Sequence, residues 1–559
     1  MDRYLLAWAA ESPEVFQTEV LVLGSGIAGL YTAIKASDSF QVTVVTKKKI
    51  KDSNTEHAQG GIAAAMDEED SPAFHYEDTL LAGAGLCDPE TVKILVEEGP
   101  LRVEELIAMG AQFDYEGASL AFTREGAHSR RRVLHANGDA TGGEIERTLV
   151  QAARLCTRIQ VRENRFVVDL LRNREGAVLG ALVFNTEKRR AEAYLAKVVV
   201  LATGGVGQVF GHTTNPEVAT ADGMAAAWRA GATLMDMEFL QFHPTALHLA
   251  GAPRFLISEA VRGEGGQLIN RAGKRFMDGI PGRELAPRDV VARAIWEEMN
   301  HGEVYLDFRP IGRDKILERF PSIRDTCRNY GLDVLEAPIP VAPAAHYMMG
   351  GVRADKYGRT TLANLYASGE CACNGVHGAT RLASNSLLDG LVFGARIVDR
   401  IMAEAEALRP VPQWREADRT GARGEASFGE AGFGRTPARR NDLPEHGRAE
   451  EESMRSALQR LMWDKVGIQR RGEDLAEAVA TLEAWAEGFS PSAEEKDLEL
   501  VNMLTVGWLI AKSALARRES RGAHYRADYP QRSDPEWGKH SLLSRRDEFV
   551  RYVPTGGDC

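Results

Sequence analysis

The chain has 559 residues, more than a single hydrophobic core can organise, and its apolar share of 44% is ordinary for a soluble globular protein. The net charge is −12, and because Lys and Arg are spread along the chain we expect no binding of nucleic acid. We find no apolar run of about 18 residues and no basic, apolar leader. The sequence therefore predicts several domains, no membrane span and a cytoplasmic protein.

The six cysteines are scattered, and none has the paired spacing of a zinc or iron–sulfur site. Cys371 and Cys373 are close enough in sequence to form a redox pair, but we favour small buried thiols. We therefore expect a reducing compartment and no metal.

The first elements of the chain predict an α/β fold of the nucleotide-binding kind. Residues 19–36 indicate a short apolar strand, a glycine turn and an alanine-rich helix, and residues 41–47 indicate a second strand. A third apolar strand follows at 197–205, after a long insertion, and a fourth at 361–370. We therefore predict a doubly wound, Rossmann-like domain that is discontinuous in sequence.

The rest of the chain divides around this domain, to which we assign residues 1–245 and 343–404. The block between them, 246–342, has the size of a small inserted domain. Residues 405–449 are rich in Gly, Pro, Arg and Glu, with little apolar periodicity, so we predict a linker. Residues 450–559 have apolar side chains at helical spacing, which predicts a C-terminal helical bundle.

A glycine motif, GSGIAG, occupies residues 24–29 between the first strand and its helix. Its first glycine permits the turn, its second lets the backbone approach a pyrophosphate, and its third allows close helix packing. The helix N-terminus adds free N–H donors and positive potential. A tight turn without a ligand is the alternative. We predict cofactor contacts at Gly24, Ser25, Gly26, Ala28 and Gly29.

Glycine turns also close the third and fourth strands. Because carboxyl ends of parallel strands meet at one edge of a sheet, we predict cofactor contacts at Ala202, Thr203, Gly204, Gly369 and Glu370. Glu370 is placed to accept from ribitol or ribose hydroxyls, with a surface carboxylate as the alternative. The second strand lacks the acidic residue that usually binds the ribose of NAD, which disfavours NAD.

Five further blocks recur in the order typical of one family. They are HAQGGI at 57–62, QFHPT at 241–245, SEAVRGEGG at 258–266, PRD at 287–289 and RLASNSL at 381–387. The chain therefore resembles the succinate dehydrogenase, fumarate reductase and L-aspartate oxidase family of flavoproteins over nearly its whole length. The resemblance implies FAD, with the flavin ring between the cofactor domain and an α+β capping domain at 246–342.

The resemblance also implies further contacts to FAD. They fall at Thr46, Lys47, Asn54, Ala58, Gln59, Gly60, Gly61, Asp222, Asn385, Ser386 and Leu387. In members integrated into respiratory complexes, a histidine at the position of Asn54 carries the flavin covalently. Because Asn has no nucleophilic ring nitrogen, we expect FAD to be held non-covalently here.

The same blocks imply a clamp for a dicarboxylate. Arg381 can hold one carboxylate through two parallel donors, with His346 beside it, and His243 and Ser258 can hold the other. Each residue alone would more often be structural, but the family positions favour substrate binding.

Arg288 resembles the proton-transfer arginine of the family, and Glu259 and Arg262 match its proton relay to solvent. A carboxylate between two arginines can pass a proton while the local charge stays balanced. A buried ion-pair network without a catalytic role is the alternative.

The segment TREGAHSRRRVLHA at 123–136 distinguishes the branches of the family. It resembles the aspartate oxidase signature, and Glu125 offers a partner for an α-ammonium group, which succinate lacks. We therefore expect oxidation of L-aspartate to iminoaspartate, with oxygen or fumarate as electron acceptor. The resemblance implies the first step of NAD biosynthesis, upstream of quinolinate synthase.

Two alternatives stay open. The tail at 518–524 and 534–540 resembles the respiratory flavoproteins, which supports a soluble fumarate reductase or a succinate dehydrogenase flavoprotein subunit. The alternative from another class is a flavin-binding structural or regulatory subunit without turnover. The full set of pocket residues argues against it.

Overall fold

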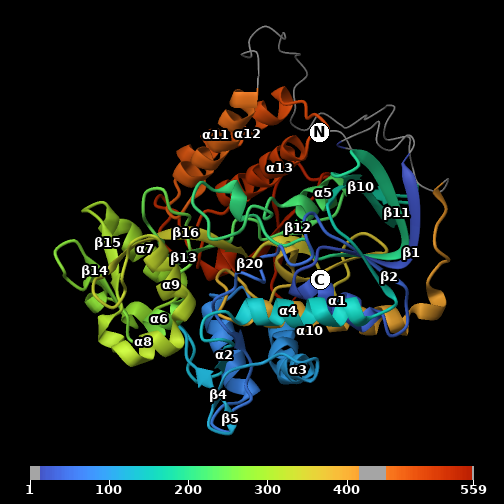
Figure 1. Ribbon diagram of the computed structural model, residues 1–559. Coiled ribbons are helices and arrows are strands. Elements are labelled where there is room, and N and C mark those ends of the chain that lie inside the picture. Colours follow the sequence, from blue (N-terminus) through green and yellow to red (C-terminus); the bar gives the residue numbers. More distant parts are fainter. Residues whose placement is uncertain (1–4, 6–12, 415–447, 557–559) are drawn as a thin grey trace.

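A seven-stranded sheet forms the centre of the computed structural model, which describes residue 5 and residues 13–414 and 448–556 (Figure 1). Across the sheet the strands are β8 (Ile159–Arg162), β2 (Val42–Val45), β1 (Glu14–Leu23), β11 (Arg190–Leu201), β10 (Val178–Asn185) and β9 (Arg165–Arg172), with β18 (Leu365–Ala367) beside β11. The strands β8, β2, β1, β11 and β18 run parallel, whereas β10 is antiparallel to both of its neighbours. The predicted discontinuous α/β fold is confirmed.

The strand β1 shows why this sheet lies at the centre. Its last four residues are all buried, because side chains on both faces of the strand are covered. Val20 and Val22 pack with α1 (Ile27–Ala36) and α10 (Asn385–Ala403), whereas Leu21 and Leu23 pack with α5 (Asp222–Ala230) and α13 (Glu495–Ala516). A parallel sheet buried on both faces requires such a continuous apolar run.

The carboxyl ends of the parallel strands meet where the glycine turns lie. Gly24 has a φ of +114°, and a Cβ there would lie 2.0 Å from the Ala202 carbonyl oxygen. A residue with a side chain is therefore excluded at this turn, and β1 and β11 can close together. Beyond α1, the helices α4 (Thr141–Leu155), α3 (Pro89–Ala108) and α2 (Pro72–Ala82) continue the same layer.

A four-stranded sheet carries the lobe on the left of Figure 1. Its strands, in order, are β13 (Leu240–Leu247), β16 (Ile339–Met348), β15 (Val304–Asp307) and β14 (Gln267–Asn270), and its helices are α6 (Glu259–Gly263), α7 (Arg288–Met299), α8 (Arg313–Arg319) and α9 (Pro321–Asn329). The lobe has an apolar core of its own. Because β13 and β16 run across both ends of the block assigned to 246–342, those boundaries stay predictions.

Three further sheets complete the strands of the described residues. A five-stranded sheet consists of β19 (Ala372–Cys373), β17 (Gly351–Arg353), β12 (Leu234–Met235), β20 (Lys539–Leu543) and β21 (Arg551–Pro554). The others are β3 (Ile62–Ala63), β7 (Val133–Leu134) and β6 (Phe122–Thr123), and the pair β4 (Tyr115–Glu116) and β5 (Ser119–Leu120). The C-terminal segment thus ends in two strands, β20 and β21, beyond its helices. Cys371 and Cys373 are both buried, as predicted.

The C-terminal segment begins with α11 (Arg448–Val466), α12 (Gly472–Gly488) and α13, followed later by α14 (Asp534–Trp537). By length and composition alone α13 could cross a bilayer, but 83% of its apolar window is buried inside the protein, as in a core helix. Residues 415–447 of the predicted linker lie outside the described residues.

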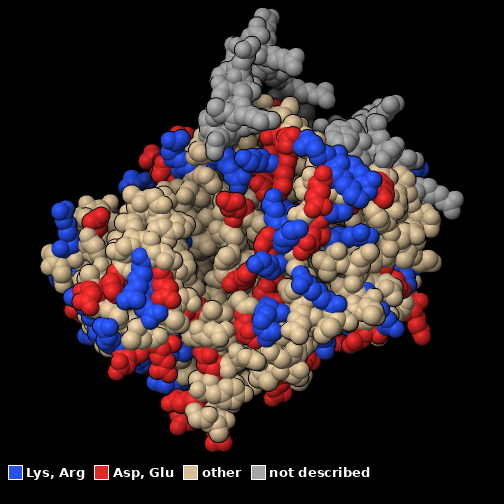
Figure 2. All heavy atoms as spheres, viewed as in Figure 1, with Lys and Arg blue, Asp and Glu red and all other residues tan. Residues whose placement is uncertain are grey.

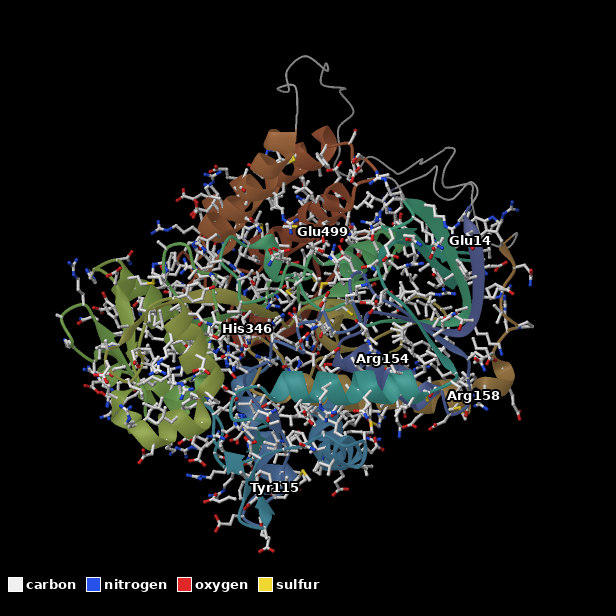
Figure 3. All side chains as sticks on the ribbon, viewed as in Figure 1. Glu14, Tyr115, Arg154, Arg158, His346 and Glu499 are labelled. Carbon is white, nitrogen blue, oxygen red and sulfur yellow. The ribbon has the colours of Figure 1, made fainter. Side chains whose placement is uncertain are left out.

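A buried ion cluster joins α13 to the central sheet. Lys47 Nζ, just after β2, donates to Thr220 at 2.6 Å, to Asp222 at 2.9 Å and to Glu499 on α13 at 2.7 Å. Figure 3 labels Glu499, which lies on α13 on the side toward the centre of the molecule. One helical turn earlier, Glu495 pairs with Lys48, whose side chain is 43% exposed. Glu499 is the more buried of the two carboxylates, and it also accepts from Arg455 at 3.0 Å.

This pair of carboxylates gives a matched test of how α13 is held. We expect Glu499→Gln to lower the free energy of unfolding by about 1–3 kcal/mol, because a buried bond to a charged group is lost. Glu495→Gln, at a pair whose lysine side chain is 43% exposed, should change it by about 0–1 kcal/mol. Urea denaturation of both variants measures the difference, and equal effects would contradict a role for burial.

Candidate active site

A cavity of about 1600 Å³, including its opening to solvent, lies where the carboxyl ends of the central strands face the α6–α9 lobe. Figure 2 shows the surface hollowed between that lobe and the rest of the molecule. The lining of the cavity runs from the glycine turns of the central sheet to α6 and α7 of the lobe, so a cofactor and a substrate can lie in it side by side.

Most residues predicted to contact FAD line this cavity. They are Gly24, Ser25, Gly26, Ala28, Thr46, Lys47, Asn54, Ala58, Gln59, Gly60, Gly61, Ala202, Thr203, Gly204, Asp222, Gly369, Glu370, Ser386 and Leu387. Two others lie behind the wall. Gly29 faces the turn after β1, since a Cβ there would lie 2.2 Å from the Gly24 carbonyl oxygen, and Asn385 is hydrogen-bonded to His75 and Thr79.

The wall has the features that an FAD molecule needs. Gly204 has a φ of +74°, and a Cβ there would meet no atom of the described residues within 4 Å, so its backbone faces open space. Asn54 Oδ1 and Gln59 Oε1 are buried and, within the described part of the chain, have no hydrogen-bond partner. The N-terminus of α1 opens on the same wall and favours an anionic group. The residues therefore fit the cofactor.

Lys47 and Asp222, both predicted to contact FAD, pair their charges with other side chains of the protein. All three donors of the Lys47 ammonium are engaged by Thr220, Asp222 and Glu499, and Asp222 also accepts from Asn502 at 2.8 Å. Lys47 thus supports the wall without offering its charge to a ligand. Lys47 still lines the cavity, so its contact with FAD stays a prediction.

Glu370 lines the cavity from the turn after β18. Its carboxylate accepts from Met348 N and from Asn54 Nδ2, both at 3.0 Å. Burial raises the pKa of Glu370 to about 7, although these two donors favour the charged form. The group is therefore poised to lose a proton near neutral pH.

At the other end of the cavity, two arginines share one glutamine. Gln241 Oε1 accepts from Arg288 at 3.0 Å and from Nε and Nη2 of Arg381 at 3.3 Å, and Gln241 Nε2 donates to the Arg381 carbonyl at 2.8 Å. Arg381 also lies over the Tyr347 ring at 4.3 Å and donates to Ser386. Burial and the nearby Arg288 lower the pKa of Arg381 to about 10, so it remains a cation at neutral pH.

Glu259 links two of the predicted catalytic residues. It accepts from Arg288 Nε at 2.5 Å and pairs with Arg262 at 3.3 Å. Burial raises the pKa of Glu259, but Arg288 and Arg262 together lower it to about 2. Arg288 and Glu259 line the cavity, whereas Arg262 lies behind them and donates to the Glu284 carbonyl. The three residues form a chain of charges leading away from the cavity.

Two histidines from paired strands, His243 on β13 and His346 on β16, lie with ring centroids 5.0 Å apart (Figure 3 labels His346). His243 Nδ1 accepts from Thr245 N, which places its proton on Nε2, and His346 Nδ1 is bonded to Thr214. Burial, with Arg288 near His243 and Arg381 near His346, lowers the pKa of both rings. Both are neutral, and Ser258 lines the same end of the cavity.

Glu125, in the loop between β6 and β7, also reaches this end. Its Oε2 accepts from Ser384 Oγ at 2.6 Å, whereas its buried Oε1 has no hydrogen-bond partner in the described ranges. Burial and Glu259 raise the pKa of Glu125, and Arg288 and Ser384 oppose the rise. One carboxylate oxygen is thus left for a ligand.

Sequence reasoning assigned no role to Gln241 or Ser384, although both lie within recognised blocks. Gln241 could have been found, because residues two apart on a strand share a face and His243 was already predicted. Ser384 gave no such signal, since a serine before a helix ordinarily indicates a cap.

Comparisons with known proteins define the class. A model of the FAD binding domain matches residues 19–387, and a model of the fumarate reductase flavoprotein C-terminus matches residues 455–554. A mutant FrdA chain of E. coli quinol fumarate reductase has a TM-score of 0.87 and 30% identity, covering 98% of each chain. A Mycobacterium smegmatis Sdh1 complex has a TM-score of 0.79 and 33% identity, covering 98% of this chain and 95% of the other. The chain is thus an FAD-binding oxidoreductase.

The curated relatives are more similar still. L-aspartate oxidase of Streptomyces coelicolor is 46% identical over 96% of this chain and 93% of its own length, and that of Nostoc is 43% identical over 98% and 96%. The chain therefore belongs to the succinate dehydrogenase, fumarate reductase and L-aspartate oxidase family, as its motifs predict.

The titration of Glu370 gives a test of its predicted contact with FAD. An ionised Glu370 accepts hydroxyl donors better than a protonated one, so FAD binding should release its proton. We expect the affinity of the apoprotein for FAD to rise up to about tenfold per pH unit below pH 7 and to level off above it. Glu370→Gln should flatten the profile in a fluorescence titration; an unchanged slope would assign the proton elsewhere.

The same shift has a consequence for stability without FAD. The pKa of Glu370 is raised in the folded protein, so the unfolded chain ionises first. The ligand-free protein should lose stability as pH rises from about 4.3 to about 7, and Glu370→Gln should remove that loss.

Proposed function

We propose that this protein oxidises L-aspartate to iminoaspartate, with oxygen or fumarate as electron acceptor. The observation that carries the proposal is the free Oε1 of Glu125, buried at the end of the cavity where Arg288 and Arg381 also lie. A dicarboxylate suits the two arginines, and a carboxylate oxygen beside them suits an ammonium group. Aspartate carries both features.

The substrate carboxylates have donors of two kinds. Arg381 offers a guanidinium, with His346 next to it, for one carboxylate. His243, through Nε2, and the hydroxyl of Ser258 serve the other. Because the two histidines are neutral, they add no further positive charge, and His243 can donate through Nε2. Holding both ends of the substrate fixes its Cα, and such positioning supplies much of the rate.

FAD, when bound, supplies the two-electron oxidant and passes the electrons to oxygen, giving hydrogen peroxide, or to fumarate, giving succinate. We propose that it is held non-covalently, because Asn54 offers an amide where covalent attachment needs a ring nitrogen, and that amide already donates to Glu370. Acid precipitation should therefore release free FAD, and flavin that stays with the peptide would contradict this.

Proton transfer is assigned to Arg288, supported by Glu259 and Arg262. The 2.5 Å bond from Arg288 to Glu259 keeps a carboxylate next to the arginine as a proton leaves or returns. Glu259 in turn pairs with Arg262, which leads away from the cavity. Fumarate reduction needs a proton delivered to carbon, and this chain of groups can resupply Arg288.

The product suggests which reaction must follow this one. Iminoaspartate is an unstable imine, so an enzyme that consumes it must act soon after it forms. We propose quinolinate synthase for that step, in the cytoplasm, as the start of NAD biosynthesis. The curated relatives named L-aspartate oxidase support the oxidation step on which this assignment depends.

The test compares aspartate with succinate. Anaerobic L-aspartate should bleach the yellow protein, and oxygen readmitted afterwards should yield peroxide. Glu125→Gln should lower kcat/KM for aspartate about 10²-fold or more, because a buried ammonium is left without its anion, and should change succinate oxidation less than about threefold.

Arg288→Lys is the contrasting variant, since a lysine ammonium cannot hold both Gln241 and Glu259 in one planar fork. It should retain FAD and lose turnover with both substrates. Bleaching by succinate alone in the unaltered protein would move the assignment to a succinate dehydrogenase or fumarate reductase.

A further inference from the structure

Ser384 precedes α10 but does not cap it as a serine in that position usually does. At the N-cap of α10 a serine normally has extended backbone angles, and its oxygen accepts from an N–H of the first turn. Ser384 instead has φ 62° and ψ 4°, in the left-handed region, and makes no side-chain cap bond within the described part of the chain. A side chain in that region is strained.

The hydroxyl that is not used for capping serves Glu125 instead. Ser384 Oγ donates to Glu125 Oε2 at 2.6 Å across 259 residues of sequence. Ser384 is 6% exposed and Glu125 1% exposed, and both line the cavity. The Ser384 carbonyl accepts from Ala63 N at 3.1 Å, which fixes the backbone from the other side.

The bond leaves Glu125 with one orientation. Its Oε2 is occupied, so Oε1 is the oxygen that can meet a ligand. Gly60 keeps space beside it, since a Cβ at Gly60 would lie 3.3 Å from Oε1 and 3.6 Å from Ser384 Oγ. A donor at Oε2 also favours the charged carboxylate, against the effects of burial and of Glu259.

We propose that Ser384 is a positioning residue that sets the preference for an amino-dicarboxylate over an unsubstituted one. It acts by holding Glu125 with its free oxygen toward the α-ammonium group. The inference rests on the proposed oxidation of aspartate. It adds a residue that need not touch the substrate and explains why α10 begins with a strained serine.

The test uses Ser384→Gly, because glycine accepts the left-handed backbone without strain and removes only the hydroxyl. We expect kcat/KM for aspartate to fall about 10- to 100-fold, as for a lost hydrogen bond to a charged group. The acidic limb of its pH profile should move to higher pH, since the donor that favours ionised Glu125 is gone. Fumarate reduction with a reduced viologen dye, and FAD affinity, should change less than about twofold.

Two further variants separate positioning from structure. Ser384→Asn tolerates the left-handed backbone and carries an amide donor, so it should recover part of the aspartate activity. Ser386→Ala, two residues on, removes the hydroxyl that Arg381 contacts and should lower turnover of aspartate and fumarate alike.

The outcomes distinguish the two proposals. If the unaltered protein does not oxidise aspartate, the proposed function fails and the role of Ser384 with it. If it does, and Ser384→Gly keeps the full rate and an unmoved pH profile, only the role of Ser384 is overturned. Equal losses with aspartate and fumarate, or loss of FAD from both Ser384 variants, would assign a structural role and also overturn it.

Discussion

Two guanidinium groups buried side by side constrain everything else at this site. Arg288 and Arg381 both donate to one oxygen of Gln241, so their charges are held close together. Glu259 balances Arg288, but Arg381 meets only dipoles and a ring in its direct contacts among the described residues: Gln241, Ser386 and Tyr347. Buried cations without a counter-ion are unfavourable by several kcal/mol. The cavity is therefore complementary to a ligand that brings its own negative charges.

The discontinuous fold makes this arrangement possible. Arg288 opens α7 in the lobe, and Arg381 precedes α10 on the central domain. Gln241 lies on β13, which pairs with β16 where the chain passes between the two parts. A single amide thus bridges charges from both sides of the cavity. Any change in how the lobe sits on the sheet would alter the separation of the two arginines, so substrate binding depends on the interface.

Much of this could be predicted from the sequence, because the signals are local. The glycine turn at Gly24 and the apolar run of β1 each depend on a few neighbouring residues. The engagement of the Lys47 ammonium could not be predicted, since Glu499 is 452 positions away in the chain. The same reason hid β20, a short strand that pairs with β12 far earlier in the chain. The strand β21 pairs with β20. The role of Ser384 could not be predicted, because a serine before a helix ordinarily caps it, whereas this hydroxyl donates to Glu125.

Glu125 is the group with which the two ligands of the proposed reaction, aspartate and fumarate, would interact differently. Aspartate brings an ammonium and favours the ionised carboxylate, whereas fumarate would place its own charge near an ionised Glu125 and favours the protonated form. Burial and Glu259 raise the pKa of Glu125, and Arg288 and Ser384 restrain the rise. The ammonium of aspartate adds a further favourable charge for the ionised form, which an unsaturated dicarboxylate cannot supply. A single cavity can then hold both ligands through the same carboxylate donors, while their contact with Glu125 differs.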